Sequence, residues 1–515
     1  MKKTLINLIC SLIVLIINVV VSFFLSPFIV KNIGVEANGF VTLANNFVMY
    51  ATLIVTALNS MAARFISISY NKGDYKKANM YYNSVFWGNL IIVAILILPA
   101  ILSLIKLECI VDVPNTILFD VKLLFAFVFF NFFITTGFPN WDCGTFVTNR
   151  LDRSYVPQMI STLVRCLFLL IAFTLLVPKV YFVGIASTLM TLITLIANGV
   201  NTHELTPELK IELVPNKIIC SCKAIKELVL SGIWNSISSV GMILLTGVDL
   251  IICNVYLGAT SMGILSLTKI IPNYMDQLAS AVTIAFTPEL TINYAKGNKD
   301  KLLRDINRAM KLSSVILTIP ISVIIVFGKD FFSLWVPSQD AKLLQILSIL
   351  ASFKFMFTAG IQILYNVFPT VNKVKGNAIS QIITGICSIV ITILIVKFTK
   401  YGIYAVAGVS SLCAIIKNLV YIIPICAKYL DLKWNTFYKQ VFISLFSSIS
   451  VLIVGVIVRC FINVESWFML IIMCCIVGIL GLLINIFITL NREERSFLLN
   501  KVLNKIKPGY KKMNI

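Results

Sequence analysis

The chain has 515 residues, of which 59% are hydrophobic and only 13% are charged, and its mean hydropathy is +0.95. A soluble protein of this length could not cover so much apolar surface with so few charges, so the composition predicts an all-α integral membrane protein. The formal charge of +21 would suit nucleic acid if the protein were soluble. In a membrane protein such charge sets topology instead, and we expect no nucleic-acid partner.

Apolar runs of roughly 20 residues, each long enough to cross the hydrocarbon core as a helix, recur along nearly the whole chain. They show no alternating pattern of the kind that marks a β-barrel. The first run follows Lys2 and Lys3 and is too long for a signal peptide, so we expect it to be a retained span. We predict about fourteen spans, near residues 5–29, 40–63, 82–105, 120–144, 157–178, 180–200, 228–256, 262–288, 309–328, 342–366, 377–396, 402–424, 438–460 and 466–490.

Basic residues are distributed unequally between the loops on the two sides of these spans. An even number of spans places both termini on one side of the membrane. Roughly 31 of the 43 Lys and Arg residues then fall on that side and roughly 9 on the other. This bias predicts that both termini are cytoplasmic, and the same charges attract anionic lipid.

The sequence contains an internal repeat at an offset of 224 residues, as the pair Gly34 and Gly258 illustrates. An I-x-Y-x-K-G motif closes the second span at 68–73 and recurs after the eighth at 292–297. Further identical pairs at this offset are Gly39 and Gly263, Leu43 and Leu267, and Tyr50 and Tyr274. Loops after the fourth and tenth spans carry the related dipeptides Asn149-Arg150 and Asn372-Lys373. Repeats of this kind indicate a duplicated bundle.

The repeat predicts the domain organisation. We expect an N-terminal six-helix bundle at 1–203, a cytoplasmic linker at 204–227 and a second six-helix bundle at 228–430. Two extra transmembrane helices follow at 431–490, and a basic cytoplasmic tail covers 491–515. Because each bundle has an even number of spans, the bundles share one orientation and are related by an axis along the membrane normal. This arrangement is typical of transporters that work by alternating access.

Polar residues lie inside several spans, where a charge costs roughly 2.5–3.5 kcal/mol on insertion scales. In the eighth span Lys269, Asn273 and Asp276 share one helical face, and Pro272 interrupts the backbone hydrogen bonding beside them. Lys269 and Asp276 are separated by roughly 10.5 Å along the helix axis, too far for a direct ion pair. We therefore expect each to have another partner or water.

Other embedded polar groups are Arg165 in the fifth span, Asn235 and Asp249 in the seventh and Lys354 in the tenth. In the first half of the repeat, the neutral residues Asn45 and Asn131 correspond to Lys269 and Lys354, respectively. One interpretation is a hydrated cavity whose fixed cations Arg165, Lys269 and Lys354 bind an anionic headgroup. Its polar lining would be Asn45, Asn131, Asn235 and Asn273, and Asp249 and Asp276 would couple an ion or balance the cations. The other interpretation is that these residues only position helices against one another.

Motifs for catalysis and metal binding are missing from the sequence. It contains no phosphate-binding G-x-x-x-x-G-K-[ST] loop, no nucleophile elbow and no H-E-x-x-H motif. The 13 cysteines have no metal-ligand spacing, and His203 is the one histidine. We therefore predict that the protein is not an enzyme and needs neither cofactor nor metal.

The sequence resembles the multidrug/oligosaccharidyl-lipid/polysaccharide (MOP) exporter superfamily, whose fold is MATE-like. Within that superfamily it is most similar to the bacterial polysaccharide and O-antigen flippases. The residues that carry the resemblance are the second-span stretch 39–65 with Tyr70–Asp74, and the eighth-span stretches 269–274, 287–289 and 294–297. The similarity extends over about the first 430 residues in architecture.

The resemblance implies a function in the synthesis of cell-surface polysaccharide. A lipid-linked oligosaccharide, commonly on undecaprenyl pyrophosphate, would move from the inner to the outer leaflet of the bacterial cytoplasmic membrane. Glycosyltransferases and a polysaccharide polymerase would be partners. The alternative is a cation-coupled multidrug efflux antiporter of the same superfamily. Such relatives often use an acidic residue in the first span, and this chain has none between Lys3 and Lys31, although Asp249 lies in the corresponding seventh span.

Overall fold

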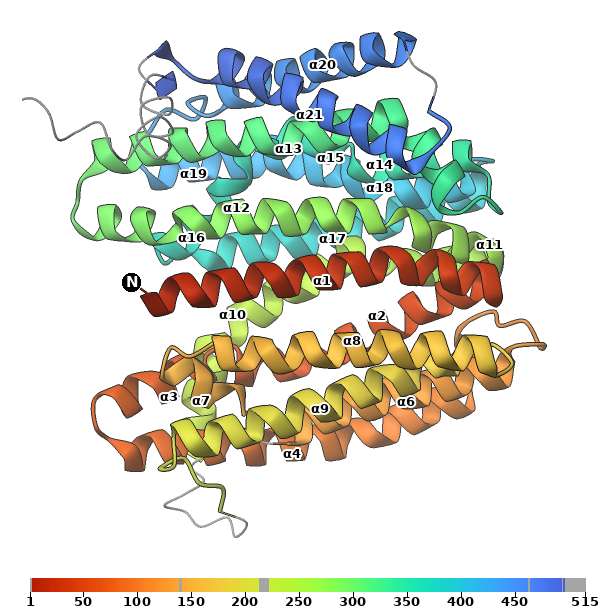
Figure 1. Ribbon diagram of the computed structural model, residues 1–515. Helices are drawn as coiled ribbons and strands as arrows, with labels where there is room; N and C mark the ends of the chain where they lie inside the picture. The colour runs from red at the N-terminus through yellow and green to blue at the C-terminus, as the bar shows by residue number, and fades with distance from the viewer. Residues whose placement is uncertain (1, 139–140, 213–221, 462–463, 493, 496–515) are drawn as a thin grey trace, which may run out of the picture. The chain divides into compact units, whose positions relative to one another are not determined.

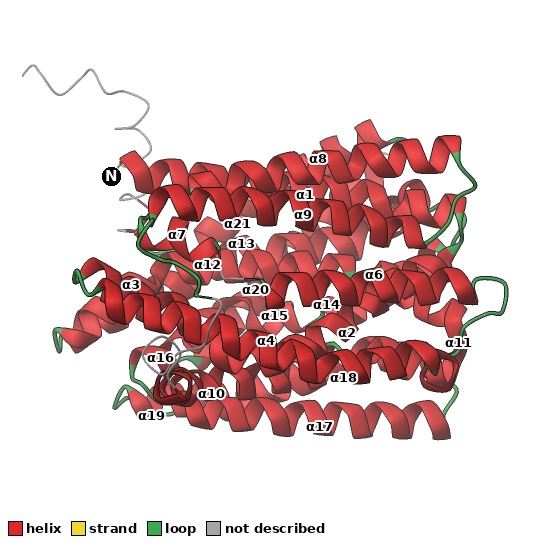
Figure 2. Cartoon of the chain, turned by 90° about the horizontal axis from the view of Figure 1, so that it is seen from below, coloured by secondary structure: helices red, strands yellow, loops and turns green. Residues whose placement is uncertain are grey.

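The computed structural model describes residues 2–138, 141–212, 222–461, 464–492 and 494–495. These residues form helices joined by loops, and no strand occurs among them (Figure 2). The expected all-α fold is confirmed. Helices are the expected structure in lipid, because a helix pairs its backbone N–H and C=O groups internally. Hydrocarbon could not form hydrogen bonds with groups that were left unpaired.

Twelve stretches of described helix are long and apolar enough to cross a membrane. One of them, the 62-residue stretch Lys223–Ile284, covers two of the predicted spans. The shorter apolar stretch Ile16–Asn32 lies in the first predicted span. The protein is therefore a multi-pass membrane protein, and every predicted span coincides with helix.

The chain divides by its contacts into two compact units. Unit 1 consists of Met1–Leu267 with Gln381–Ile403, and unit 2 of Thr268–Ser380 with Tyr404–Ile515. The predicted division into bundles 1–203 and 228–430 is based on the sequence repeat, whereas the two units are defined by contacts. The division into bundles therefore stays a prediction. Parts of the predicted linker 204–227 and tail 491–515 lie outside the described residues.

The described residues of unit 1 form eleven helices and most of a twelfth, and most of them are labelled in Figure 1. They are α1 (Lys2–Asn32), α2 (Val35–Asn59), α3 (Ala62–Asn71), α4 (Tyr75–Ile105), α5 (Leu107–Ile110), α6 (Leu118–Gly137), α7 (Asp142–Val147), α8 (Asp152–Leu175), α9 (Tyr181–Leu205), α10 (Cys222–Thr246), α11 (Asp249–Thr268) and most of α17 (Val374–Phe398). The long helix α10 packs against α2. There the hydroxyl of Tyr50 and the amide of Asn46 both donate to the carbonyl of Gly247, at 2.6 and 3.2 Å.

Unit 2 is built around α13, the longest helix of the chain. Its helices are α12 (Ile270–Ala295), α13 (Lys299–Trp335), α14 (Ala341–Ser352), α15 (Lys354–Thr358), the 3₁₀ segment η1 (Ala359–Asn366), α16 (Val367–Thr370), α18 (Gly402–Lys417), the π segment η2 (Asn418–Ile422), α19 (Ile423–Tyr429), α20 (Tyr438–Phe461) and α21 (Trp467–Thr489). The predicted tenth span is therefore not one helix, because α14, α15 and η1 divide it.

The two C-terminal helices are fixed to unit 2 by hydrogen bonds inside an apolar layer. Both α20 and α21 pack on α13 (Figure 1). The buried amide of Asn485 on α21 donates to the hydroxyl of Thr318 on α13 at 2.8 Å. On α20 the hydroxyl of Ser444 lies 2.7 Å from that of Ser314 and accepts from the backbone N–H of Gly360 at 3.1 Å. Such polar contacts position helices where apolar packing alone is unspecific.

The internal repeat recurs in the backbone conformation. Positions that match in the sequence share the left-handed region, which glycine adopts freely and asparagine tolerates. The pairs are Gly34 (φ 117°) and Gly258 (φ 84°), Gly73 (φ 78°) and Gly297 (φ 68°), and Asn149 (φ 54°) and Asn372 (φ 55°). The two glycine pairs lie at the repeat offset and the asparagine pair lies one residue from it, so the repeat includes turns as well as helices.

The residues after the second glycine pair start the next helices in the same way. The Asp74 side chain accepts from the N–H of Lys77 at 3.0 Å at the start of α4. Its counterpart Asn298 accepts from the N–H of Lys301 at 3.1 Å at the start of α13. Each is an N-cap that satisfies one of the free amides of a helix terminus.

Pro272 breaks the predicted eighth span near its centre. Helix α11 ends at Thr268 and α12 begins at Ile270. Because proline has no N–H, it cannot bond the carbonyl four residues earlier, which is that of Thr268. The hydroxyl of Ser348 on α14 donates to this carbonyl at 3.4 Å. The Thr268 carbonyl, which loses its intrahelical donor because of Pro272, therefore accepts a hydrogen bond from a neighbouring helix.

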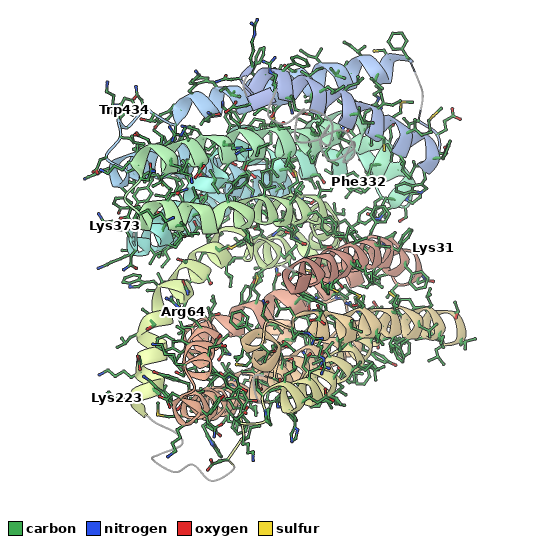
Figure 3. All side chains as sticks on the ribbon, turned by 60° about the vertical axis from the view of Figure 1, so that its left-hand side comes forward. Lys31, Arg64, Lys223, Phe332, Lys373 and Trp434 are labelled. Carbon is green, nitrogen blue, oxygen red and sulfur yellow. The ribbon has the colours of Figure 1, made fainter. Side chains whose placement is uncertain are left out.

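Figure 3 labels six residues that lie toward the two ends of the units. In unit 1, Lys31 lies at one end, and Arg64 and Lys223 lie toward the other. In unit 2, Lys373 and Trp434 lie toward one end and Phe332 toward the other.

A close helix crossing in unit 1 gives a test of packing. An added Cβ at Gly241 of α10 would lie 2.7 Å from the backbone of Gln381 on α17, so the helices would have to separate. We expect Gly241→Ala to destabilise the protein by about 1–3 kcal/mol. The matched control is Gly478→Ala on α21, where no heavy atom lies within 4 Å of the added Cβ. Thermal unfolding in detergent should show a lower midpoint for the first variant only, and equal midpoints would contradict the crossing.

Candidate functional site: buried cations and a polar cavity

An ion pair lies inside unit 2 between α12 and α15. The ammonium of Lys354 is 3.0 Å from each carboxylate oxygen of Asp276. The side chain of Lys354 is 17% exposed and that of Asp276 is 40% exposed, so the pair is half-buried and within reach of solvent. The helical spacing excludes Lys269 as a direct partner of Asp276, and the structure provides Lys354 in its place.

A second buried lysine lies near this pair. Lys417, the last residue of α18, is 7% exposed, and its ammonium lies 5.1 Å from the centroid of the Tyr365 ring. The hydroxyl of Tyr365 donates to Asn418 at 3.0 Å, at the start of the π segment η2. Lys417 is near enough to Lys354 for their charges to interact. Lys417 lies inside the predicted span 402–424, so the sequence shows an embedded charge there. It is nevertheless not among the predicted site residues.

Arg165 is a half-buried cation of unit 1. It lies on α8, and its Nε atom is buried with no hydrogen-bond partner. Among the described residues its guanidinium forms no hydrogen bond and no ion pair. A charged group whose Nε donor is buried without a partner is unfavourable, so the site is suited to a ligand that brings a negatively charged acceptor.

The other predicted site residues occupy varied environments. Asn45, Asn235 and Asn273 are exposed on the protein, and Lys269 is half-buried immediately before α12. The amide of Asn45 donates to the carbonyl of Val41 in its own helix at 2.9 Å. Asn131 has a buried Oδ1 atom with no partner. Asp249 is 7% exposed at the start of α11. The structure thus joins Lys354 to Asp276 and leaves the roles of the other residues as predictions.

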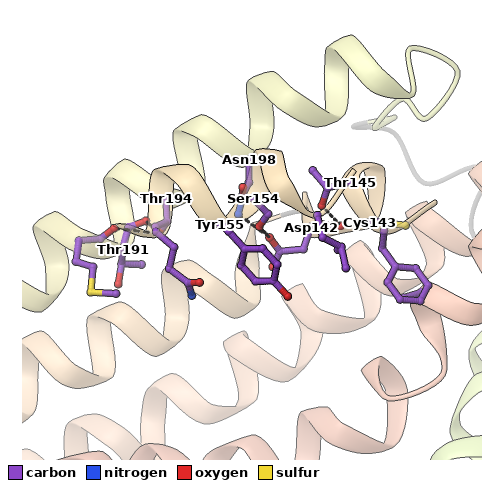
Figure 4. Close-up of a pocket in the computed structure, with 13 residues that line it drawn as sticks. Asp142, Cys143, Thr145, Ser154, Tyr155, Thr191, Thr194 and Asn198 are labelled. Carbon is purple, nitrogen blue, oxygen red and sulfur yellow. Dashed lines mark hydrogen bonds between the residues drawn. The ribbon is translucent and has the colours of Figure 1, made fainter. Parts of the chain in front are cut away.

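A polar cavity of about 470 Å³ lies within unit 1 between α7, α8 and α9 (Figure 4). Its acidic residue is Asp142, the first residue of α7. The short helix is held against α9, because the Thr202 hydroxyl donates to the carbonyl of Trp141. Gly144 permits the approach, since a Cβ there would lie 2.7 Å from Thr202. Asp142 lies near the end of the predicted span 120–144, and it is not among the predicted site residues because nothing local in the sequence predicts that α7 packs against α9.

Comparisons with known proteins agree with this architecture. A family profile described as "Polysaccharide biosynthesis protein" matches residues 2–291. The chain is 26% identical over 501 residues to "Uncharacterized membrane protein EpsK" of Bacillus subtilis (strain 168), covering 97% of this chain and 98% of that one.

Two solved structures share the fold at low sequence identity. A lipid II flippase, MurJ, in an inward closed conformation has a TM-score of 0.63 at 15% identity, covering 93% of this chain and 98% of that one. An inward-facing multidrug resistance MATE transporter of the MOP superfamily has a TM-score of 0.61 at 15% identity, covering 81% of this chain and 94% of that one.

The chain is a multi-pass membrane protein with a MATE-like fold. The chain belongs to the polysaccharide biosynthesis protein family, whose profile covers more than half of it. The resemblance noted from the second and eighth spans is confirmed.

The ion pair of unit 2 can be measured by a double-mutant cycle. Lys354→Ala and Asp276→Ala should each destabilise the protein, and the double variant should lose less than their sum. We expect a coupling free energy of about 1 kcal/mol, because solvent screens the partly exposed carboxylate. Unfolding in SDS titrations gives the measurement. Combining Asp276→Ala with Lys342→Ala, which removes an exposed lysine of α14, should be additive, and additivity at Lys354 as well would refute the pair.

Proposed function

We propose that this protein moves a lipid-linked oligosaccharide, on a phosphate or pyrophosphate headgroup, from the inner to the outer leaflet of a bacterial cytoplasmic membrane. The family description, polysaccharide biosynthesis, supports a glycan as cargo. The fold likeness to a lipid II flippase supports transport of a lipid whose headgroup crosses the membrane. The mechanism would be alternating access, in which the tail stays in lipid while the polar part passes through the protein.

The observation that carries this proposal is the Arg165 guanidinium, whose Nε atom is buried and has no hydrogen-bond partner. Guanidinium presents N–H donors in a planar fork that matches the oxygens of a phosphate. Its Nε donor is buried without a partner. A phosphate would satisfy that donor and also neutralise the charge, whereas the hydroxyl of a neutral cargo could satisfy only the donor.

The ion pair of unit 2 supports the same class of substrate. Lys354 can exchange its carboxylate partner for a phosphate, because both are anions that accept from an ammonium group. Asp276 would then balance the charge of Lys354 when no substrate is bound. This pairing favours the charge-balancing role of Asp276 over ion coupling, and so favours the flippase over the multidrug antiporter.

Topology and partners complete the proposal. The excess of Lys and Arg in alternate loops supports cytoplasmic termini. Glycosyltransferases on the cytoplasmic side would supply the lipid-linked glycan, and a polymerase on the outer side would consume it. The protein itself would make and break no covalent bond.

The test uses charge-neutralising variants in cells whose surface polysaccharide depends on this protein. We expect Arg165→Gln and Lys354→Gln each to reduce surface polysaccharide by about tenfold or more, because each removes a desolvated contact to the headgroup. Lipid-linked glycan should accumulate in the inner leaflet. Arg165→Lys should keep part of the activity, since it keeps the charge but not the fork.

The matched control is Lys400→Gln, which removes an exposed lysine outside the spans. Abundance in the membrane fraction is measured for every variant, so that loss of function is separated from loss of protein. Normal polysaccharide display by both Arg165→Gln and Lys354→Gln at wild-type abundance would rule out these residues as headgroup ligands.

A further inference from the structure

The polar cavity between α7, α8 and α9 has a second compartment. A smaller cavity of about 250 Å³ adjoins it, and four residues line both: Asp142, Thr191, Thr194 and Asn198. Figure 4 shows these side chains, which come from α7 and α9, with Ser154 and Tyr155 of α8 beside them. The larger compartment, at about 470 Å³, has the size that is usual for a small-molecule site, roughly 300–1,000 Å³.

The larger compartment is lined by one acidic side chain and by no basic one. The Asp142 carboxylate accepts from the Asn198 amide at 2.5 Å and from the Ser154 hydroxyl at 3.5 Å. Within the described part of the chain this carboxylate forms no ion pair. The cavity therefore disfavours a second anion, such as a phosphate or an acidic sugar, because like charges repel.

The threonine hydroxyls around the carboxylate use their protons on the backbone. Thr191 donates to the carbonyl of Ser187 at 2.9 Å, and Thr194 donates to that of Met190 at 3.0 Å. Their oxygen lone pairs remain for a ligand. The lining thus presents mainly acceptors, and it suits a ligand with several hydroxyl donors, as a sugar has.

Buried amide oxygens in the smaller compartment also require donors. The Oδ1 atoms of Asn59, Asn89 and Asn198 are buried and accept no hydrogen bond. All three residues line this compartment, and Asn89 is only 3% exposed. An acceptor left unsatisfied in this way is unfavourable. A ligand hydroxyl, or a water that the ligand holds in place, would satisfy it.

Aromatic rings lie beside these acceptors. Phe146 and Tyr155 line the larger compartment. Phe138 and Trp141 line the smaller one, with their ring centroids 5.7 Å apart. A pyranose ring has hydroxyl groups at its edge and C–H groups on its face, so it can use polar acceptors and aromatic surfaces together. An inorganic ion has no apolar face and could use the acceptors only.

The cavity lies toward the predicted cytoplasmic side of unit 1. Ser154, Tyr155 and Gln158 belong to the first two turns of α8. The preceding loop carries Asn149-Arg150 and follows an even number of predicted spans, so it is predicted to lie on the same side as the termini. A glycan assembled in the cytoplasm would therefore reach the cavity from the side on which it is made.

We propose that this cavity binds one neutral sugar residue of the transported glycan, through hydroxyl groups that donate to the Asp142 carboxylate and to the neighbouring amide and hydroxyl oxygens. The C–H face of the sugar packs against the aromatic rings. The assignment of this site rests on the proposed function, because it takes a glycan as the cargo. It deepens that function by separating two tasks, since Arg165 and Lys354 contact the phosphate whereas the Asp142 cavity selects the sugar.

The test is native mass spectrometry of the purified full-length protein with two lipids. One is the lipid-linked glycan extracted from cells that make it but lack this protein, and the other is bare polyprenyl pyrophosphate. We expect the wild type to bind the glycan-linked lipid about tenfold more tightly, because hydrogen bonds to a charged group are among the stronger ones. Asp142→Asn should lose most of this preference and bind the bare lipid as before. The control Asp112→Asn, which neutralises an exposed acid outside the cavity, should keep the preference.

A second pair of variants covers the case in which Asp142→Asn fails to fold. Thr194→Val removes an oxygen that lines both compartments. Its control, Thr174→Val, removes a hydroxyl that bonds only the backbone of α8. We expect a smaller preference for the glycan-linked lipid from Thr194→Val alone.

The possible results separate this site from the proposed function. No preference of the wild type for the glycan-linked lipid, or an unchanged preference in Asp142→Asn or Thr194→Val, would overturn the sugar site and leave the proposed function intact. Binding of neither lipid would contradict the proposed function and the sugar site with it. Monosaccharide analysis of the extracted glycan should find at least one neutral sugar, and a glycan of acidic sugars alone would also overturn the assignment.

Discussion

The structure depends on one constraint, which is that hydrocarbon offers no hydrogen bond to a polar group. Every backbone amide and carbonyl must find a partner inside the protein, and helices supply almost all of them. Where a helix fails, a side chain takes over, as Ser348 does for the carbonyl that Pro272 leaves free. For the same reason the Asn485 amide donates a hydrogen bond to Thr318, and Lys354 pairs with Asp276. Against this background an unsatisfied group such as the Arg165 guanidinium or the Asn89 amide oxygen is conspicuous.

Sequence alone predicts those features that depend on neighbours along the chain. Apolar runs locate the helices, and the repeat locates the turns at Gly34 and Gly258, because a left-handed turn requires glycine at that one position. Partners far apart in sequence are not predictable in this way. Asp276 pairs with a lysine 78 residues away, and helical spacing could exclude Lys269 but could not identify Lys354. Asp142 could not be predicted for a related reason, since it lines the cavity only because α7 packs against α9.

The two units differ in the charge that they hold. Unit 2 contains Lys354, Asp276 and Lys417 close together, whereas the repeat counterpart of Lys354 in unit 1 is the neutral Asn131. Unit 1 instead contains Arg165 without an anion and, separately, Asp142 without a cation. A duplicated fold has thus acquired different electrostatics in its two copies. We interpret unit 1 as holding a residue that can bind an anion, and unit 2 as holding a lysine whose carboxylate partner can be exchanged.

The central claim is that buried cations recognise an anionic headgroup on a lipid-linked glycan. It is tested most directly by native mass spectrometry of the purified protein with two lipids that carry the same oligosaccharide, one on polyprenyl pyrophosphate and one on the uncharged polyprenol. The account predicts that the pyrophosphate-linked lipid binds at least about tenfold more tightly, because its pyrophosphate accepts charge-assisted hydrogen bonds and the uncharged polyprenol offers no anion to accept them. Equal binding of the two lipids would contradict it.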